Sequence, residues 1–147
     1  MKLYLILLGF VIISCQNKQE KEITLDVEDK KSFEMYEFSE MAMLMEQMYV
    51  ENERLKAKIM NGDDLGEFPD YFVKIHGAVM TDPSENDAFF KEQAELFIKA
   101  QKQIYNDTEN AEAHYNTMIN QCINCHQVKC GGPIPKIKKL YLNSQNE

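Results

Sequence analysis

Two cysteines and a histidine near the end of the chain have a spacing that suits one particular chemistry. They are Cys122, Cys125 and His126, and together they form the pattern C-x-x-C-H. On one helical turn, thiols three residues apart can add to the two vinyl groups on one edge of a porphyrin. The imidazole of the next residue is then held beneath the ring, where it can bind the iron. The spacing therefore predicts covalent attachment of one haem c, with His126 as an axial ligand.

Two other kinds of site remain open for these residues. A zinc site could use Cys122, Cys125, His126 and Cys130, although four ligands from nine consecutive residues are cramped for a tetrahedron. A redox-active dithiol is less favoured, because that motif belongs beside a βαβ unit, which the sequence pattern does not show. If haem takes two thiols, Cys130 is left as a free thiol or as a disulfide link in a homodimer.

The first fifteen residues predict export. Met1 and Lys2 precede an apolar run over residues 3–13, which is shorter than the roughly 20 residues of a membrane span and fits the core of a signal peptide. The run ends in Ser14 and Cys15, which resembles the lipobox of bacterial lipoproteins. This resemblance implies removal of residues 1–14 and a lipid on Cys15 that anchors the protein in the cell envelope, on the periplasmic or outer-membrane side. A signal peptide with a chance cysteine and an uncleaved anchor helix are the alternatives.

The remaining sequence favours a flexible tether followed by one helical domain. Residues 15–31 are polar and charge-rich, whereas residues 32–147 carry the apolar periodicity of a folded domain. The chain has only 6 Gly and 4 Pro, and its abundant Met, Glu, Lys and Leu favour helix. The net charge of −8 would repel a phosphate backbone, so we expect no nucleic-acid partner. No phosphate-binding loop or Ser-centred nucleophile motif occurs, so we do not expect an enzyme.

Apolar periodicity predicts four helices in an antiparallel up-down bundle. The first runs from an N-cap at Ser32 to Asn61, and Gly62 closes it. One face of this helix carries the apolar stripe Met41, Leu44, Met45, Met48, Leu55 and Ile59.

The other three predicted helices are shorter. The second begins at Pro69, and its buried side would consist of Phe72, Ile75, His76 and Val79. The third begins at an N-cap at Asp82, and its stripe comprises Phe90, Ala94, Phe97 and Ile104. The fourth spans residues 110–126 and carries the C-x-x-C-H motif at its end. The tail over residues 134–147 would cover one end of the bundle.

Helix number and motif position together resemble the class II c-type cytochromes, which include cytochrome c-prime. Members of that family are four-helix bundles with C-x-x-C-H on the last helix, matched here by Cys122, Cys125 and His126. The resemblance covers residues 32–130, and the attachment motif is its only specific sequence feature. The sequence over residues 129–135, Lys-Cys-Gly-Gly-Pro-Ile-Pro, departs from the short basic ending of the family and leaves the surroundings of the haem edge open.

The resemblance also implies where the second axial ligand would come from. In this family the first helix supplies the residue facing the iron, which is Met in low-spin electron carriers and an apolar non-ligand in gas-binding members. We favour Met45, with Met41 and Met48 as alternatives, although Met at helical spacing is also ordinary core filler. His76 on the second predicted helix is a less favoured candidate, and it would give a bis-His haem.

The function expected from these features is that of a membrane-anchored monohaem cytochrome carrying single electrons. Its partner would be a membrane or periplasmic oxidoreductase. A gas-binding haem sensor for NO or CO is the first alternative, and a zinc-stabilised lipoprotein without a redox role is the second.

The lipobox generates the first prediction. We expect Cys15→Ala to release the protein from the membrane fraction, because the acyl chains are the proposed anchor, while the domain stays folded and soluble. Fractionation with immunoblotting measures this. Retention of the variant in the membrane would indicate an uncleaved anchor helix instead.

Overall fold

The computed structural model describes residues 37–142, and its regular structure is entirely helical. The long helices are α1 (Glu40–Asn61), α2 (Ala88–Asn106) and α3 (Ala111–Lys129), followed by the short α4 (Ile134–Ile137). The 3-10 helices are η1 (Asp70–His76), η2 (Pro83–Glu85), η3 (Thr108–Asn110) and η4 (Lys138–Leu140). No strand occurs in this part of the chain, which confirms the prediction of an all-α domain. The signal peptide, Cys15 and the tether lie outside the described residues.

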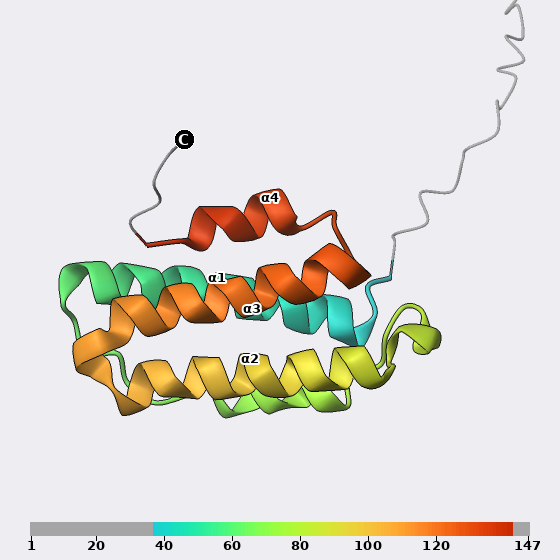
Figure 1. Ribbon diagram of the computed structural model, residues 1–147, viewed down its shortest axis with the longest axis horizontal. Helices are drawn as coiled ribbons and strands as arrows, with labels where there is room; N and C mark the ends of the chain where they lie inside the picture. The colour runs from blue at the N-terminus through green and yellow to red at the C-terminus, as the bar shows by residue number, and fades with distance from the viewer. Residues whose placement is uncertain (1–36, 143–147) are drawn as a thin grey trace, which may run out of the picture. The chain divides into compact units, whose positions relative to one another are not determined.

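Successive elements alternate in direction along one axis (Figure 1). Helices α2 and α3 form the closest pair, packed antiparallel along their lengths. Helix α1 contacts α3 at fewer positions and shares η1 as a neighbour with α2. Helix α4 follows α3 after a sharp reversal and runs back along it, on the side away from α2 (Figure 1).

Helix α1 begins later than its apolar pattern suggested. Its N-cap is Ser39, whose Oγ accepts a hydrogen bond of 3.2 Å from the backbone N–H of Ala42. The predicted cap at Ser32 is therefore wrong, and Ser32 itself lies outside the described residues. The predicted end is confirmed, since Gly62 has φ +71° and its N–H bonds back to carbonyls of the last turn.

The second predicted helix is a 3-10 helix, η1, and its buried side differs from the prediction. Phe72 and Ile75 are buried, whereas His76 and Val79 are exposed. A 3-10 helix has three residues per turn, so positions 72 and 75 lie on one face and position 76 turns away from it. Val79 follows the end of η1 and donates its backbone N–H to the Glu40 carboxylate at 3.0 Å.

The third predicted helix starts five residues later than expected. Asp82 caps only the short η2, where its carboxylate accepts the N–H of Ser84 at 2.9 Å. The N-cap of α2 is instead Asp87, which accepts the N–H of Phe90 at 2.9 Å. The fourth predicted helix is confirmed as α3, and it continues three residues beyond His126 to Lys129.

A buried polar network joins the three long helices. Asn52 of α1 and Gln101 of α2 are 3% and 0% exposed, and Gln101 Nε2 donates to Asn52 Oδ1 at 3.1 Å. Tyr115 of α3, also fully buried, donates its hydroxyl to the Asn52 carbonyl at 2.8 Å. Asn52 Nδ2 donates to the carbonyl of Met48. Buried hydrogen bonds of this kind fix the relative position of helices, because any sliding would strand polar atoms in an apolar core.

The C-terminal segment (residues 131–142) lies along the side of the domain, in contact with α1 and α3. The prediction that the tail covers one end of the bundle is therefore wrong. Ile137 and Leu140 are buried in the core. Lys56 of α1 donates to the carbonyls of Lys139 and Tyr141 at 2.8 and 2.7 Å. The segment is thus attached to α1 by backbone acceptors as well as by apolar contacts.

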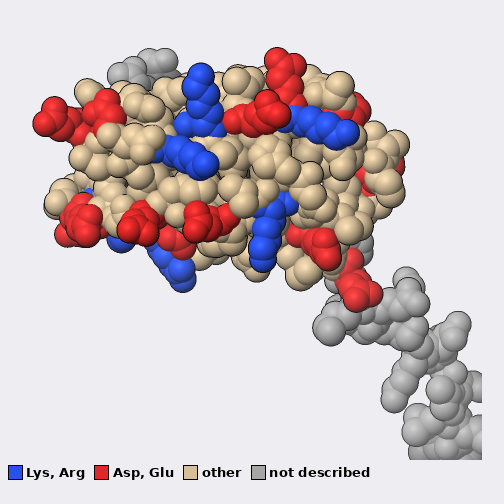
Figure 2. Space-filling model, turned by 90° about the horizontal axis from the view of Figure 1, so that it is seen from below, with Lys and Arg blue, Asp and Glu red and all other residues tan. Residues whose placement is uncertain are grey.

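The surface carries charges of both signs. On the face formed by α2 and η1, acidic and basic side chains alternate without a large patch of either sign (Figure 2). Among the described residues, no helix has the length and apolar content required to cross a bilayer.

Candidate functional site

An apolar cavity opens beside the C-terminal half of α3. It is lined by the two cysteines and the histidine of the C-x-x-C-H motif. Cys122, Cys125 and His126 form one wall. The opposite wall comes from α1, with Met45, Met48, Tyr49 and Asn52. Helix α2 contributes Phe90, Ala94 and Phe97, and the C-terminal segment contributes Pro133, Lys136, Ile137 and Leu140. Ile75 of η1 completes the lining, so the cavity joins five segments of the chain.

Helical geometry explains why both thiols reach the same cavity. Cys122 and Cys125 are three residues apart, and His126 follows Cys122 by four, so all three lie on adjoining parts of one face of α3. Ile123 points to the buried side of the same turn, whereas Asn124 is exposed. The Cys122 Sγ contacts the Met118 Sδ one turn earlier at 3.8 Å.

The two thiols are held in their neutral form. Burial among apolar side chains raises the pKa of Cys122 to about 12, and the nearby Cys125 adds to the shift. Burial also raises the pKa of Cys125, although the Lys129 ammonium opposes it. A buried neutral thiol is a poor nucleophile and a poor metal ligand, because both roles need the thiolate. Both side chains are half-buried and line the cavity, and their raised pKa lowers the fraction of thiolate at neutral pH.

The imidazole of His126 is oriented by the end of its own helix. Its Nδ1 lies 2.9 Å from the carbonyl oxygen of Cys130, while the Cys130 N–H donates to the His126 carbonyl at 3.1 Å. A carbonyl only accepts, so Nδ1 must carry the proton. Nε2 is then left with the lone pair that binds a metal. This tautomer suits an axial ligand.

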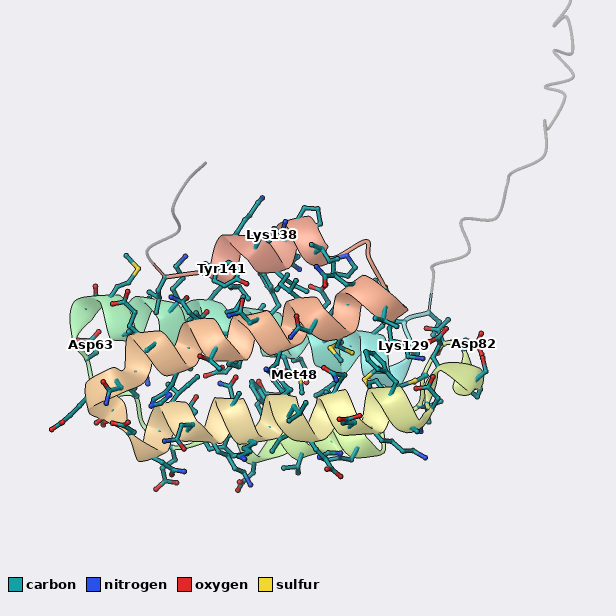
Figure 3. All side chains as sticks on the ribbon, viewed as in Figure 1. Met48, Asp63, Asp82, Lys129, Lys138 and Tyr141 are labelled. Atoms are coloured by element: carbon teal, nitrogen blue, oxygen red, sulfur yellow. The ribbon has the colours of Figure 1, made fainter. Side chains whose placement is uncertain are left out.

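An ion cluster holds the end of α3 that carries the motif. Lys129 Nζ bonds Glu85 of η2 at 2.9 Å and Asp87, the N-cap of α2, at 2.6 Å. The Lys129 side chain is 16% exposed, whereas the side chains of Glu85 and Asp87 are 46% and 47% exposed, so only the ammonium side of the cluster is shielded from water. Figure 3 shows Lys129 at the end of the molecule where η2 meets the C-terminus of α3. The cluster fixes the motif turn against α2.

The methionine candidates differ in their position relative to the cavity. Met45 is half-buried and Met48 is buried, and both line the cavity opposite the motif. Met48 lies in the interior between the helices (Figure 3). Met41 is buried in the core but does not line the cavity.

The two remaining histidines lie elsewhere. His76 is exposed, beside a surface hollow lined by α2 residues, and is not brought together with His126. His114 pairs with Asp107 at 2.9 Å near the start of α3 and holds the pKa of that carboxyl below its usual range.

The zinc alternative finds no support in the geometry. Within residues 37–142, no group of three or more His, Cys, Asp or Glu side chains is arranged to hold a metal ion. Cys130 is exposed and outside the cavity, and its carbonyl rather than its thiol contacts His126. The four proposed zinc ligands therefore do not converge.

The side chains that line the cavity are of the types that hold a haem, but the cavity itself is too small for one. Two thiols and an imidazole with a free Nε2 are the groups that c-type attachment uses, and the cavity adds a thioether that could serve as a sixth ligand. The cavity measures about 100 Å³, whereas sites for cofactor-sized ligands measure roughly 300–1,000 Å³. Side chains or a whole wall must therefore move outward when a porphyrin is held here.

Sequence reasoning missed several residues of this site. Asn52 and Gln101 interrupt apolar stripes, yet each stands at helical spacing from stripe members on both sides, and that spacing could have identified them as buried. Glu46 lies outside the apolar stripe of the first helix, yet it lines the cavity with Tyr49. The apolar pattern of the tail marked Ile137 as a packing residue, but it did not show that the tail folds back beside the cavity, so Lys136 was missed.

Comparisons of the chain with models of protein families, with curated proteins and with solved structures find no match.

The buried thiols generate a prediction for the full chain isolated with free cysteines. At about pH 8, we expect Cys122 to react with iodoacetamide on the order of 10²–10³ times more slowly than in urea, because its raised pKa depletes the thiolate. The rate should climb as the pH rises above 9 toward 12, the range in which the thiol ionises. Mass spectrometry of tryptic peptides measures it, with the exposed Cys130 as internal reference. Equal rates for Cys122 in the folded and unfolded chains would contradict this account.

Proposed function

We propose that this protein is a membrane-anchored monohaem c-type cytochrome that carries single electrons. Cys122 and Cys125 attach one haem c through thioether bonds, and His126 Nε2 binds its iron. The observation that carries the proposal is the convergence of both thiols, this imidazole and Met45 on one apolar cavity. When bound, the haem supplies one-electron exchange between the ferric and ferrous states of its iron.

The chain's own residues would hold the group and keep water from it. The apolar side chains of Phe90, Ala94 and Phe97 give the cavity a low-polarity floor. The Cys130 carbonyl keeps the His126 ring in one orientation, and the Lys129 cluster keeps the motif turn in place. A fixed site of this kind favours electron transfer, because little has to rearrange when the charge on the iron changes.

The proposal extends to fold and family. We propose a class II-like antiparallel bundle in which α1, α2 and α3 are the long members and η1 stands in place of the fourth helix. Supporting this are the alternating chain direction and the position of the motif at the end of the last long helix (Figure 1). The lipid on Cys15 would keep the domain at the membrane, within reach of a membrane or periplasmic oxidoreductase.

A gas-binding sensor is the second candidate, and Met45 decides between the two. Met45 is the half-buried methionine that lines the same cavity as the motif, so its thioether could close the sixth position and block exogenous ligands. Met48, buried on the same wall, is the alternative for this role. A sensor would need that position open.

Haem attachment is tested by removing the thiols. From cells able to mature c-type cytochromes, the wild-type protein should give a c-type pyridine haemochrome, with colour that survives acid–organic extraction. Cys122→Ser/Cys125→Ser should lose covalent haem completely, because no thioether can form, and Cys130→Ser is the matched control that keeps it. Stoichiometric zinc with no haem in the wild-type protein would refute the proposal.

The sixth ligand is tested by optical spectroscopy. We expect a low-spin ferric spectrum with a weak far-red band from Met ligation, and slow or absent CO binding by the ferrous form. Met45→Ala should make the haem high-spin and CO-reactive, whereas Met41→Ala, which alters a residue outside the cavity, should not. Rapid CO binding by the unaltered protein would favour the sensor. If only Met48→Ala has this effect, Met48 and not Met45 is the sixth ligand. If only His76→Ala has it, the haem has bis-His ligation.

A further inference from the structure

The C-terminal segment forms one wall of the cavity and is attached differently at its two ends. At its start, Gly131 and Gly132 are exposed, and a side chain added at either would meet nothing within 4 Å. At its far end, Asn116 holds Leu142 by two hydrogen bonds, of 3.0 Å to its carbonyl and 2.9 Å from its N–H. Lys56 holds two further carbonyls there. The segment thus begins at two exposed glycines, which suit a hinge, and is fastened by hydrogen bonds at its far end.

Between these ends, one side chain ties the segment to the opposite wall. Lys136 Nζ lies 2.5 Å from Glu46 Oε2 and 4.1 Å from the centre of the Tyr49 ring. All three residues line the cavity, so this contact crosses its mouth from the C-terminal segment to α1. The side chains of Lys136 and Glu46 are 42% and 61% exposed. Ion pairs with this exposure are weak and sensitive to salt.

From these contacts we infer that residues 131–142 are a hinged cover whose Lys136–Glu46 clasp controls access to the cavity. The cover swings at Gly131 and Gly132, remains fastened near Leu142, and takes Pro133, Ile137 and the clasp with it. Opening it removes a complete wall of the cavity, which supplies the room that a porphyrin needs and that the closed site lacks. This inference rests on the cavity and its wall and does not depend on haem attachment.

A matched pair of lysines on the same segment tests the clasp. Lys136→Met removes the ion pair and the cation–π contact but keeps an apolar stem against the Tyr49 ring. Lys138→Met makes the same change of charge at an exposed lysine whose side chain projects away from the helices (Figure 3). The full chain with free thiols serves for both, and hydrogen–deuterium exchange reports opening of residues 134–140.

We expect Lys136→Met to speed exchange over residues 134–140 about three- to ten-fold, while residues in α2 and α3 are unaffected. Lys138→Met should behave as wild type. Raising NaCl to about 0.5 M should speed exchange in the wild type and in Lys138→Met but not in Lys136→Met. Unchanged exchange in Lys136→Met, or equal acceleration in both variants, would overturn the inference.

Uptake of added haemin, followed by stopped-flow absorbance, supplies a separate readout. The rate should rise in Lys136→Met, and with salt in the wild type, in the same proportion as the exchange rate. A haemin rate that does not follow the exchange rate would refute control of access by the clasp. If no variant takes up haemin, control of haem access by the clasp is refuted, whereas haem attachment itself is decided by the protein from cells that mature c-type cytochromes.

Discussion

The hydrogen-bond network of Asn52, Gln101 and Tyr115 is the constraint on which the rest of this structure depends. It ties Asn52 of α1 to Gln101 of α2 and to Tyr115 of α3, in the buried part of the core. Helices α1 and α2 run in one direction and α3 in the other (Figure 1). Moving seven residues from the network toward the same end of the molecule therefore leads to Met45, Ala94 and Cys122, all of which line the cavity. Two helical turns amount to about 10.5 Å on each helix. The polar network thus sets the register that brings a thioether opposite a thiol.

The same register explains what sequence reasoning could and could not reach. The motif, the long helices and the end of α1 at Gly62 are local features, and local rules predicted them. The start of α2 was misplaced because two Asp residues five apart both have capping geometry, and only the folded chain shows that Asp82 serves a single 3-10 turn. The 3-10 period of η1 was missed because Phe72 and Ile75 suit either kind of helix.

The composition of the cavity could not be predicted, because it depends on long-range packing. Glu46 and Lys56 have the periodicity of solvent-facing residues, and both acquire partners only when residues 131–142 fold back over α1. Helical periodicity placed Met41, Met45 and Met48 on one face of the first helix, with Met45 favoured and the other two as alternatives. Packing distinguishes them, since only Met45 and Met48 reach the cavity while Met41 contacts the core elsewhere. Sequence alone therefore limited the choice to one helix face, and tertiary structure reduced it to one turn.

The position of His126 at the end of α3 would affect the reduction potential of an iron bound at this site. His126 lies in the last turn of the helix, where unpaired carbonyls form the negative pole of the helix dipole. Its Nδ1–H also donates to the Cys130 carbonyl, which makes the imidazole a stronger electron donor. Both effects would favour the ferric iron and lower the reduction potential, whereas a methionine ligand on the other side raises it. The two faces of the site therefore oppose each other, and lengthening α3 beyond Cys130 would shift that balance without altering either ligand.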